Sequence, residues 1–210
     1  MGAAARYHRR PEAAISRYAD SVQRTRIVAE GERIRLRDFR EDDLPAYERW
    51  LEPGHEWQRW DGPYRDQRDA EATRRQLELA RRAADHDPRR RAVIADGDSD
   101  RLIGSVSRYW IDEETNWLAV GISVYDPAWW GKGVGTEALT LWCTYLFRAL
   151  PQIVRLDMRT WSGNHRMIRL AERLGFREEA RFRNARIVEG EYHDGLGFGV
   201  LRSEWPGASV

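Results

Sequence analysis

Hydrophobic residues along this chain follow two different periods, and the change from one period to the other marks the predicted elements. Alternation typical of strands is found over residues 32–39, 91–95, 102–110, 117–125, 153–161, 177–188 and 195–202. Apolar residues three and four positions apart predict helices over residues 41–51, 67–84, 134–149 and 164–174. The predicted order is a strand and two helices, three strands, a helix, a strand, a helix and a final strand pair.

A segment ahead of this pattern is predicted to lie outside the main domain. We expect residues 1–31 to form an N-terminal extension, in which apolar residues over 11–24 favour a helix. Three alternatives are open for this segment: it packs on the domain, it mediates dimerisation, or it is a poorly ordered start of the chain. The domain itself is predicted over residues 32–205, with a short tail over 206–210.

Three glycines occupy the turn between the strand predicted over 117–125 and the next helix, namely Gly131, Gly133 and Gly135. Glycine adopts backbone conformations closed to other residues and lets another group approach the main chain. The first turn of a helix leaves N–H groups unpaired at the positive end of its dipole. The turn therefore suits a phosphate or pyrophosphate, the alternative being a tight connection with nothing bound. Neither GxxxxGK[ST] nor GxGxxG is present.

The amino-acid composition limits the classes of function that this protein can have. A chain of 210 residues with 41% hydrophobic and 33% charged residues is typical of one soluble domain. Its net charge of +1 gives no reason to expect nucleic acid or an anionic membrane as a partner. The single Cys143 excludes an intramolecular disulfide, and neither an apolar run of about 20 residues nor a signal peptide is found. We therefore predict a cytoplasmic protein, and we expect no bound metal.

Residues 55–64 (HEWQRWDGPY) are unusually aromatic for a loop. Aromatic faces beside carboxylates suit a ligand that carries a cationic amine. The alternative is a loop pinned to the core by its tryptophans. The aromatic and acidic members of this segment are Glu56, Trp57, Trp60, Asp61 and Tyr64.

The glycine turn resembles the acyl-CoA pyrophosphate loop of the GNAT superfamily of N-acyltransferases, which is written Q/R-x-x-G-x-G/A. Trp130 stands at the Gln/Arg place, and Gly133 and Gly135 stand at the glycines. Tryptophan at the first place resembles the RimJ/RimL type, which acetylates the N-termini of ribosomal proteins.

Two further motifs resemble the same subgroup. Asn164 stands eleven residues before Gly175 and Phe176, as in the N-x10-GF segment. A G-x-Y-x-D ending is followed by a terminal E-W pair, and its residues are Gly190, Tyr192, Asp194, Glu204 and Trp205. The resemblance covers about residues 32–205.

The resemblance implies the GNAT fold, an α+β architecture with a mixed, mostly antiparallel sheet flanked by helices. Its two parallel central strands, here 117–125 and 153–161, splay apart, and acetyl-CoA lies in the gap. Backbone groups of Ser123 and Tyr125 would meet the pantetheine arm, and Asn164 would reach it from the second wall or cap a helix, two compatible roles. The implied cofactor-binding residues are Ser123, Val124, Tyr125, Trp130, Gly131, Lys132, Gly133, Val134, Gly135, Thr136 and Asn164.

The resemblance also implies acetyl transfer to a primary amine by direct attack on the thioester. The acceptor would be a small molecule or a peptide, such as a peptide N-terminus, a polyamine or an amino sugar. The protein would be a monomer or a homodimer. The acceptor-binding residues expected in the aromatic loop and the final hairpin are Glu56, Trp57, Trp60, Asp61, Tyr64 and Asp194.

Two side chains that often transfer protons in this superfamily are absent, because the tyrosine place is Ala171 and the glutamate place is Ala119. A non-catalytic acyl-CoA-binding or regulatory module is therefore the alternative class. The remaining candidates for proton transfer are His165, Asp157 and Tyr192. The alternatives are a surface position for the histidine and an ion-paired core position for the aspartate. A water relay and a strand amide that stabilises the oxyanion can also serve.

Overall fold

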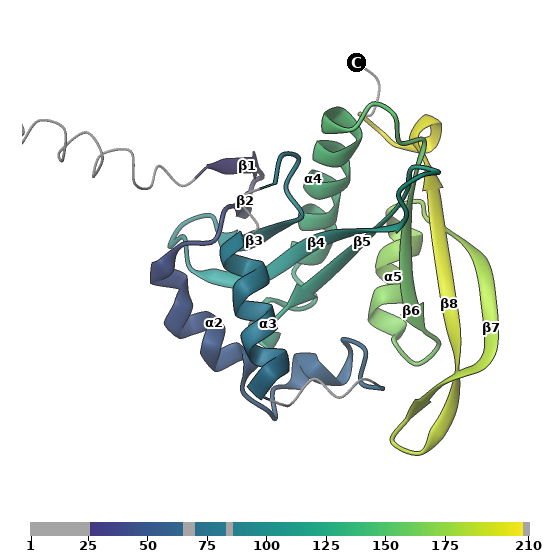
Figure 1. Ribbon diagram of the computed structural model, residues 1–210, viewed down its shortest axis with the longest axis horizontal. Coiled ribbons are helices and arrows are strands. Elements are labelled where there is room, and N and C mark those ends of the chain that lie inside the picture. The colour runs from purple at the N-terminus through teal and green to yellow at the C-terminus, as the bar shows by residue number, and fades with distance from the viewer. Residues whose placement is uncertain (1–25, 65–69, 83–85, 208–210) are drawn as a thin grey trace, which may run out of the picture.

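A computed structural model describes residues 26–64, 70–82 and 86–207 (Figure 1). Within these residues the strands form one eight-stranded sheet in the order β1-β2-β3-β4-β5-β6-β8-β7. Every neighbouring pair is antiparallel except β5 and β6, which are parallel. The strands are β1 (Ile27–Glu30), β2 (Ile34–Arg37), β3 (Arg91–Asp96), β4 (Leu102–Asp112), β5 (Trp117–Val124), β6 (Arg155–Trp161), β7 (Arg177–Val188) and β8 (Glu191–Leu201).

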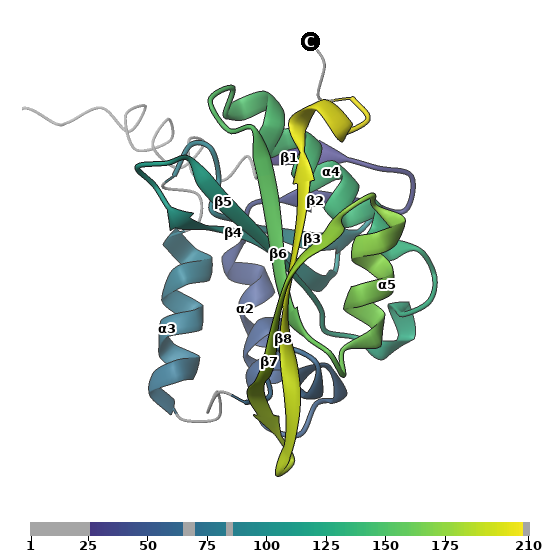
Figure 2. The ribbon, with the colours of Figure 1, turned by 90° about the vertical axis from the view of Figure 1, so that its right-hand side faces the viewer.

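Helices cover both faces of the sheet, as Figure 2 shows, with α2 and α3 on one face and α4 and α5 on the other. The α-helices are α2 (Leu44–Leu51), α3 (Ala70–Arg81), α4 (Val134–Ala149) and α5 (His165–Arg173). Short 3-10 turns are η1 (Glu41–Asp43), η2 (Glu56–Arg59), η4 (Pro127–Trp129) and η5 (Arg202–Glu204). The predicted α+β architecture with a mixed, mostly antiparallel sheet is confirmed.

The two parallel strands separate soon after they meet. β5 and β6 are in register at only two residue pairs, Leu118 with Leu156 and Ala119 with Asp157. β4 continues along the outer edge of β5 beyond that point, and β8 continues along β6. A wedge-shaped gap therefore opens between the C-terminal halves of β5 and β6, as the splayed-strand prediction requires.

Alternation along the strands divides the interior into two cores. The larger core lies between the sheet and the α4–α5 layer, and α4 contributes the fully buried Trp142 and Phe147. The smaller core packs α2 and α3 on the opposite face, around Tyr47 and Tyr125. Because side chains of a strand alternate between faces, Ser123 faces the α2–α3 layer while its neighbours pack on the larger core.

Two predicted boundaries differ from the structure. β1 lies inside residues 1–31, which were assigned to an extension, and it pairs with β2, so the sheet begins at Ile27. A strand of only four residues is too short to show a clear alternation. The predicted connection over residues 189–194 is a two-residue turn at Glu189 and Gly190, with φ of 51° and 86°. Two positive φ angles are typical of a tight hairpin, so β8 starts at Glu191.

The helix predicted over residues 11–24 lies outside the described residues. The helix predicted over 67–84 is found as α3, and residues 67–69, 83 and 84 of that prediction also lie outside the described part of the chain.

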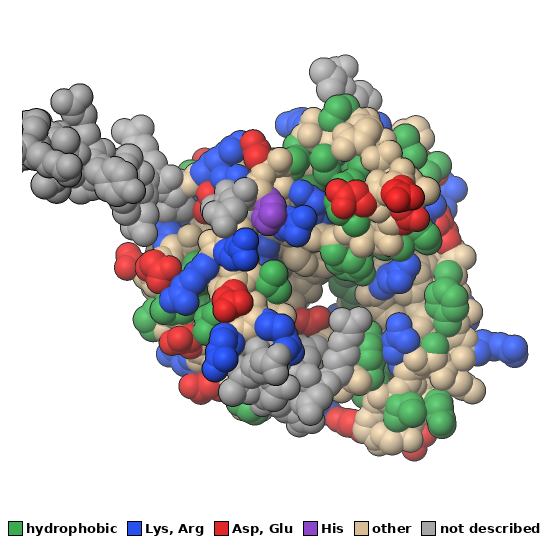
Figure 3. Space-filling view, in the orientation of Figure 1, with side chains coloured by type: hydrophobic (Ala, Val, Ile, Leu, Met, Phe, Trp, Pro, Cys, Tyr) green, Lys and Arg blue, Asp and Glu red, His purple; other side chains and the backbone are tan. Residues whose placement is uncertain are grey.

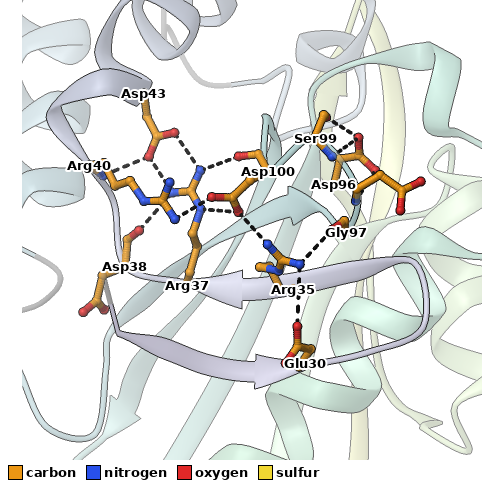
Figure 4. Close-up of polar contacts among 11 residues, drawn as sticks. Glu30, Arg35, Arg37, Asp38, Arg40, Asp43, Asp96, Gly97, Ser99 and Asp100 are labelled. Carbon is orange, nitrogen blue, oxygen red and sulfur yellow. Dashed lines mark hydrogen bonds and ion pairs between the residues drawn. The ribbon is translucent and has the colours of Figure 1, made fainter. Parts of the chain in front are cut away.

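A buried arginine fixes the start of α2 to the sheet (Figure 4). Arg37 on β2 is 1% exposed, and its guanidinium donates to both carboxylate oxygens of Asp43 at 2.7 and 2.8 Å. It also donates to the Asp100 carboxylate at 3.1 Å and to the carbonyl oxygens of Asp38 and Asp100. These bonds use all five N–H groups and offset the cost of burying the charge. The contacts thereby fix the entry into α2, which leads to the aromatic segment.

The described part of the chain lacks a membrane-spanning helix, a cluster of side chains suited to a metal ion and a reactive cysteine. No helix there is long and apolar enough to cross a membrane. No group of three or more His, Cys, Asp and Glu side chains lies there in an arrangement that could hold a metal ion. Cys143 is fully buried in α4, and burial raises the pKa of its thiol, so it packs in the core rather than acting as a nucleophile.

Candidate active site

The glycine turn lies at the open end of the gap, where β5 leads into α4. Gly131 and Gly133 have φ of 74° and 84°, in the left-handed region that favours glycine. Gly133 is the N-cap of the 16-residue helix α4, and no side chain caps it. The amides of the first helical turn therefore have no intrahelical partner and lie at the positive end of the dipole. The turn can hold a phosphate or pyrophosphate group.

The other predicted members of this turn have different surroundings. Lys132 is exposed, with its ammonium 6.0 Å from the centroid of the Trp129 ring. Val134 is buried in the larger core and anchors the start of α4. A Cβ on Gly135 would lie 3.3 Å from Leu170, so this glycine permits close packing between α4 and α5.

A groove of about 490 Å³ runs outward from the turn. Gly133 and Thr136 line it on one side, and Arg33 and Arg173 are among its other lining residues. Arg33 Nη1 lies 3.1 Å from the position that a Cβ would take on Gly133. Glu137 fixes this arginine, because its carboxylate accepts from the Arg33 backbone N–H at 2.9 Å and lies 3.8 Å from Nη1. The groove thus adds guanidinium groups to the backbone donors of the turn.

At the end of β5, the backbone N–H and C=O groups of every second residue point into the gap. Tyr125 donates its N–H to the carbonyl of Ile103 on β4 at 2.9 Å. The preceding residue, Val124, therefore faces away from β4, and its carbonyl accepts from Trp130 Nε1 at 2.9 Å. The Tyr125 amide is committed to β4, and the backbone of Ser123, two residues earlier, faces β4 as well. Both findings differ from the prediction that backbone groups of Ser123 and Tyr125 meet the pantetheine arm. The N–H groups on the gap side are those of Ile122 and Val124.

The Tyr125 side chain is also committed elsewhere. Its ring is 1% exposed in the smaller core, and its hydroxyl lies 2.7 Å from Ser105 Oγ. Nearby, Tyr47 is buried too, and burial raises the pKa of its hydroxyl. These tyrosines are packing residues below the site rather than proton carriers.

Asn164 makes two side-chain hydrogen bonds at the start of α5. Its Oδ1 accepts from the Met167 N–H at 3.0 Å, which confirms its role as the helix N-cap. Its Nδ2 donates to the carbonyl of Trp60 at 3.0 Å. The side chain is 7% exposed. Asn164 therefore joins the end of the β6 wall to the aromatic segment, a contact that the sequence did not predict.

The aromatic segment divides into a packing part and a part that reaches the gap. Trp57 is 7% exposed in the smaller core and donates its Nε1 to the Trp50 carbonyl at 3.0 Å. For Trp57 the alternative, a tryptophan that pins the loop to the core, is therefore the right one. Trp60 is half-buried, and Asp61 accepts a hydrogen bond from Ser123 Oγ on β5 at 3.0 Å. Residues 60 and 61 thus lie against both walls of the gap.

The same segment also contacts the β7–β8 hairpin. Arg59 lies 3.5 Å from the Glu189 carboxylate, and the Arg186 guanidinium lies 4.8 Å from the centroid of the Tyr64 ring. Residues 55–64 therefore span the open end of the gap from β5 to the hairpin. Of the predicted acidic residues, Glu56 is exposed on η2.

Asp194 is bound within the hairpin. It accepts from the Asn184 backbone N–H at 3.0 Å and from Arg181 at 3.0 Å. These two bonds hold the pKa of the Asp194 carboxyl below its usual range. Its role in the structure is to join β7 to β8, and within the described residues its carboxylate makes no hydrogen bond or ion pair with the aromatic segment.

Small residues lie on the α2–α3 face of β4 and β5, next to the gap. Ser105 and Ser107 of β4 stand beside Ser123 and Gly121 of β5. Figure 3 shows a hollow in the middle of this face. This face of β5, opposite to α4 and α5, is therefore open to a small molecule.

Two buried indole N–H groups, those of Trp60 and Trp161, have no hydrogen-bond partner in the described part of the chain. Trp161 ends β6 and is 6% exposed, with the ring of His193 packed edge-on at 4.8 Å. A buried donor without a partner costs about 1–3 kcal/mol. Both nitrogens are shut off from solvent, so within the described residues they are unpaired donors of the protein interior and not open binding points.

The three candidates for proton transfer lie apart from one another. His165 is exposed on α5. Asp157 is 6% exposed, stands opposite Ala119, and pairs with Arg155 Nε at 2.7 Å. Tyr192 is 64% exposed and stands beside Ile187, which is also exposed. The structure does not assemble them into one catalytic group.

Sequence reasoning missed two arginines of this site, Arg33 beside Gly133 and Arg166 beside Trp130. Arginine is so frequent in this chain that neither residue stands out by type or spacing. Only the fold brings these side chains to the glycine turn.

Comparison with known proteins agrees with this geometry. Residues 33–177 match the family model described as "Acetyltransferase (GNAT) domain". The chain belongs to the GNAT acetyltransferase family. The splayed parallel pair and the glycine turn before α4 are thus the GNAT fold that the sequence resemblance implied.

Two curated relatives come from Bacillus subtilis. The chain is 28% identical over 112 residues to the "SPbeta prophage-derived uncharacterized N-acetyltransferase YokL", covering 53% of this chain and 62% of that protein. It is 30% identical over 106 residues to the "Putative ribosomal N-acetyltransferase YdaF", covering 50% of this chain and 57% of that protein. Each match therefore spans less than two thirds of the relative's length.

Among solved structures, the fold is similar to spermidine N-acetyltransferase from Vibrio cholerae in complex with CoA and spermine. The TM-score is 0.66 at 21% identity, covering 81% of this chain and 96% of that chain. At this identity the likeness shows the fold.

Proposed function

We propose that this protein is an acetyl-CoA-dependent N-acetyltransferase that acetylates a primary amine by direct attack on the thioester. The observation that carries the proposal is the uncapped glycine turn at the open end of the splayed β5–β6 pair. It provides backbone donors for a pyrophosphate beside an unpaired strand edge for an extended arm. A phosphate-bearing thioester needs a site for its pyrophosphate and, next to that site, a strand edge for its extended arm.

Acetyl-CoA would be held by the glycine turn and by the edge of β5 that faces the gap. Its pyrophosphate would lie on the amides of residues 131–136, and its pantetheine arm along the gap side of Ile122 and Val124. The nucleotide part would extend into the outer groove, which is lined by Arg33 and Arg173 and also by Glu32 and Glu137. A groove of about 490 Å³ is large enough for such a group.

The chemistry requires the acceptor amine to lose its proton, since an ammonium with a pKa of about 10 has no lone pair for attack. A strand N–H at Ile122 or Val124 would stabilise the oxyanion of the tetrahedral intermediate. The CoA thiolate, with a pKa of about 8.5, is a tolerable leaving group. Asp157 is paired with Arg155, so water is the proton acceptor that the arrangement favours.

The acceptor is proposed to be a cationic amine, held by Asp61 and by the ring of Trp60. The resemblance to the RimJ/RimL type and the similarity to YdaF support a peptide N-terminus as that amine.

Release of free CoA thiol from acetyl-CoA, measured with a panel of amines, tests the proposal. The panel should include short peptides with free and with blocked N-termini, spermidine and an amino sugar. Amine-dependent thiol release supports the enzyme. Binding of acetyl-CoA without release by any amine would favour the non-catalytic acyl-CoA-binding module.

A further inference from the structure

Arg166, on the first turn of α5, lies between two tryptophans from distant parts of the chain. Its guanidinium carbon is 4.3 Å from the centroid of the Trp130 ring and 5.3 Å from that of the Trp60 ring. In the described part of the chain it is the only arginine found over two different rings, and no carboxylate there lies within ion-pairing distance of it. We call Trp130, Arg166 and Trp60 the indole clasp.

Each ring of the clasp is attached to a different half of the candidate site. Trp130 precedes Gly131, and its Nε1 donates to the Val124 carbonyl at 2.9 Å, so its ring is fixed to the glycine turn and to β5. Trp60 belongs to the aromatic segment, and Asn164 holds its carbonyl from the end of the β6 wall. The clasp therefore crosses the open end of the gap, where an acyl-CoA arm would enter.

We infer that Arg166 is a positioning residue that links the acyl-CoA turn to the acceptor-binding segment, so that ligand binding at one is transmitted to the other. The inference rests on the proposed function for the identity of the two ligands. One guanidinium contacts a ring of each segment, and therefore fixing either ring lowers the ordering cost of the other. Acyl-CoA on the glycine turn should accordingly order residues 55–64 and strengthen acceptor binding, and by linkage the acceptor should strengthen acyl-CoA binding.

The chemistry of the side chain makes the link specific. A guanidinium is planar and can stack on an aromatic face on each side, whereas a lysine ammonium is a compact, strongly hydrated charge. Arg166→Leu should remove the link, and Arg166→Lys should restore little of it. Arg166 is exposed, so neither change should prevent folding. Arg169, exposed one turn further along α5, has no ring contact within the described residues, which makes Arg169→Leu a matched control.

Hydrogen exchange with and without CoA tests the link without needing turnover. In the native protein and in Arg169→Leu, CoA should slow exchange in peptides that cover residues 130–136 and also in those that cover 55–64. In Arg166→Leu, protection of 130–136 should persist while the response of 55–64 is lost. The KM of an accepted amine should rise on the order of tenfold in Arg166→Leu, with the acetyl-CoA Kd in the absence of amine nearly unchanged.

The outcomes separate this inference from the proposed function. Protection of both segments by CoA in Arg166→Leu would overturn the inference, as would protection of 130–136 alone in the native protein. Absence of protection at 130–136 in the native protein would overturn the acyl-CoA site itself and the inference with it. Restoration of the full response by Arg166→Lys would show that charge rather than stacking forms the link, and would contradict the indole clasp.

Discussion

Asn164 Nδ2 donates to the carbonyl of Trp60 at 3.0 Å, across 104 positions of sequence. The same side chain caps α5 through its Oδ1. One buried amide thus fixes both the helix at the end of the β6 wall and the segment that we propose for acceptor binding. The two functions use different atoms, so they can be separated by substitution.

Replacing Asn164 by Asp should keep the cap and lose the donor to Trp60. We expect the acceptor KM to rise and the melting temperature to fall, because one carboxylate oxygen still accepts from Met167 while the other faces the Trp60 carbonyl in a buried position. Asn164→Ala should lose both bonds and about 0.5–2 kcal/mol of stability. Thermal unfolding and steady-state kinetics measure the two effects. Normal kinetics in Asn164→Asp would mean that Asn164 is only a helix cap.

Gly133→Glu should weaken acetyl-CoA binding by much more than about tenfold. The change places a side chain and a negative charge beside the helix N-terminus that we assign to the pyrophosphate. Gly175 has the same φ of 84° with open space around it, so Gly175→Glu controls for backbone strain. Calorimetry on both variants gives the measurement. Unchanged affinity in a folded Gly133→Glu protein would remove the turn from the site.

Trp60→Ala and Asp61→Asn should raise the KM of an accepted amine while acetyl-CoA affinity is nearly unchanged. The first change removes an aromatic face worth about 0.5–2 kcal/mol to a cation, and the second removes the negative charge beside Ser123. Asp42→Asn, an exposed acid on η1, is the control. If both site variants keep the native KM, residues 55–64 do not bind the acceptor.

No single side chain should prove indispensable for proton transfer. Asp157→Asn, His165→Ala and Tyr192→Phe should each leave measurable turnover, because positioning and strand amides supply most of the acceleration. The structure supports this expectation, since the three lie apart and Asp157 is paired with Arg155. Single-turnover rates at saturating acetyl-CoA are the test. A loss of about a thousandfold at one position, with binding intact, would identify a dedicated proton carrier.

The fold was predictable because its signals are local. Period-two and period-3.6 patterns mark most of the elements, and the glycine turn marks the junction of β5 with α4. The sequence does not predict equally well which way an individual side chain points. Whether Trp57 or Trp60 packs inward depends on the path of η2, and the partner of the Tyr125 amide depends on its pairing with β4.

The contacts that complete the site join segments far apart in the sequence, so local sequence patterns do not predict them. Glu189 and Gly190 form a shorter turn than predicted, which places Tyr192 in the strand next to exposed Ile187. Arg166 meets Trp60 and Trp130 only after the sheet and both helical layers have assembled. Such contacts follow from the fold rather than from spacing along the chain.

The most direct test of the account is a single-turnover reaction of the native protein with acetyl-CoA and a peptide that has a free N-terminus. Mass spectrometry of the peptide and assay of free thiol should show N-acetylated product and CoA in equal amounts. The same peptide with a blocked N-terminus and no other primary amine should give neither. Tight binding of acetyl-CoA with no acetylated product from this peptide or from any other primary amine would contradict the account.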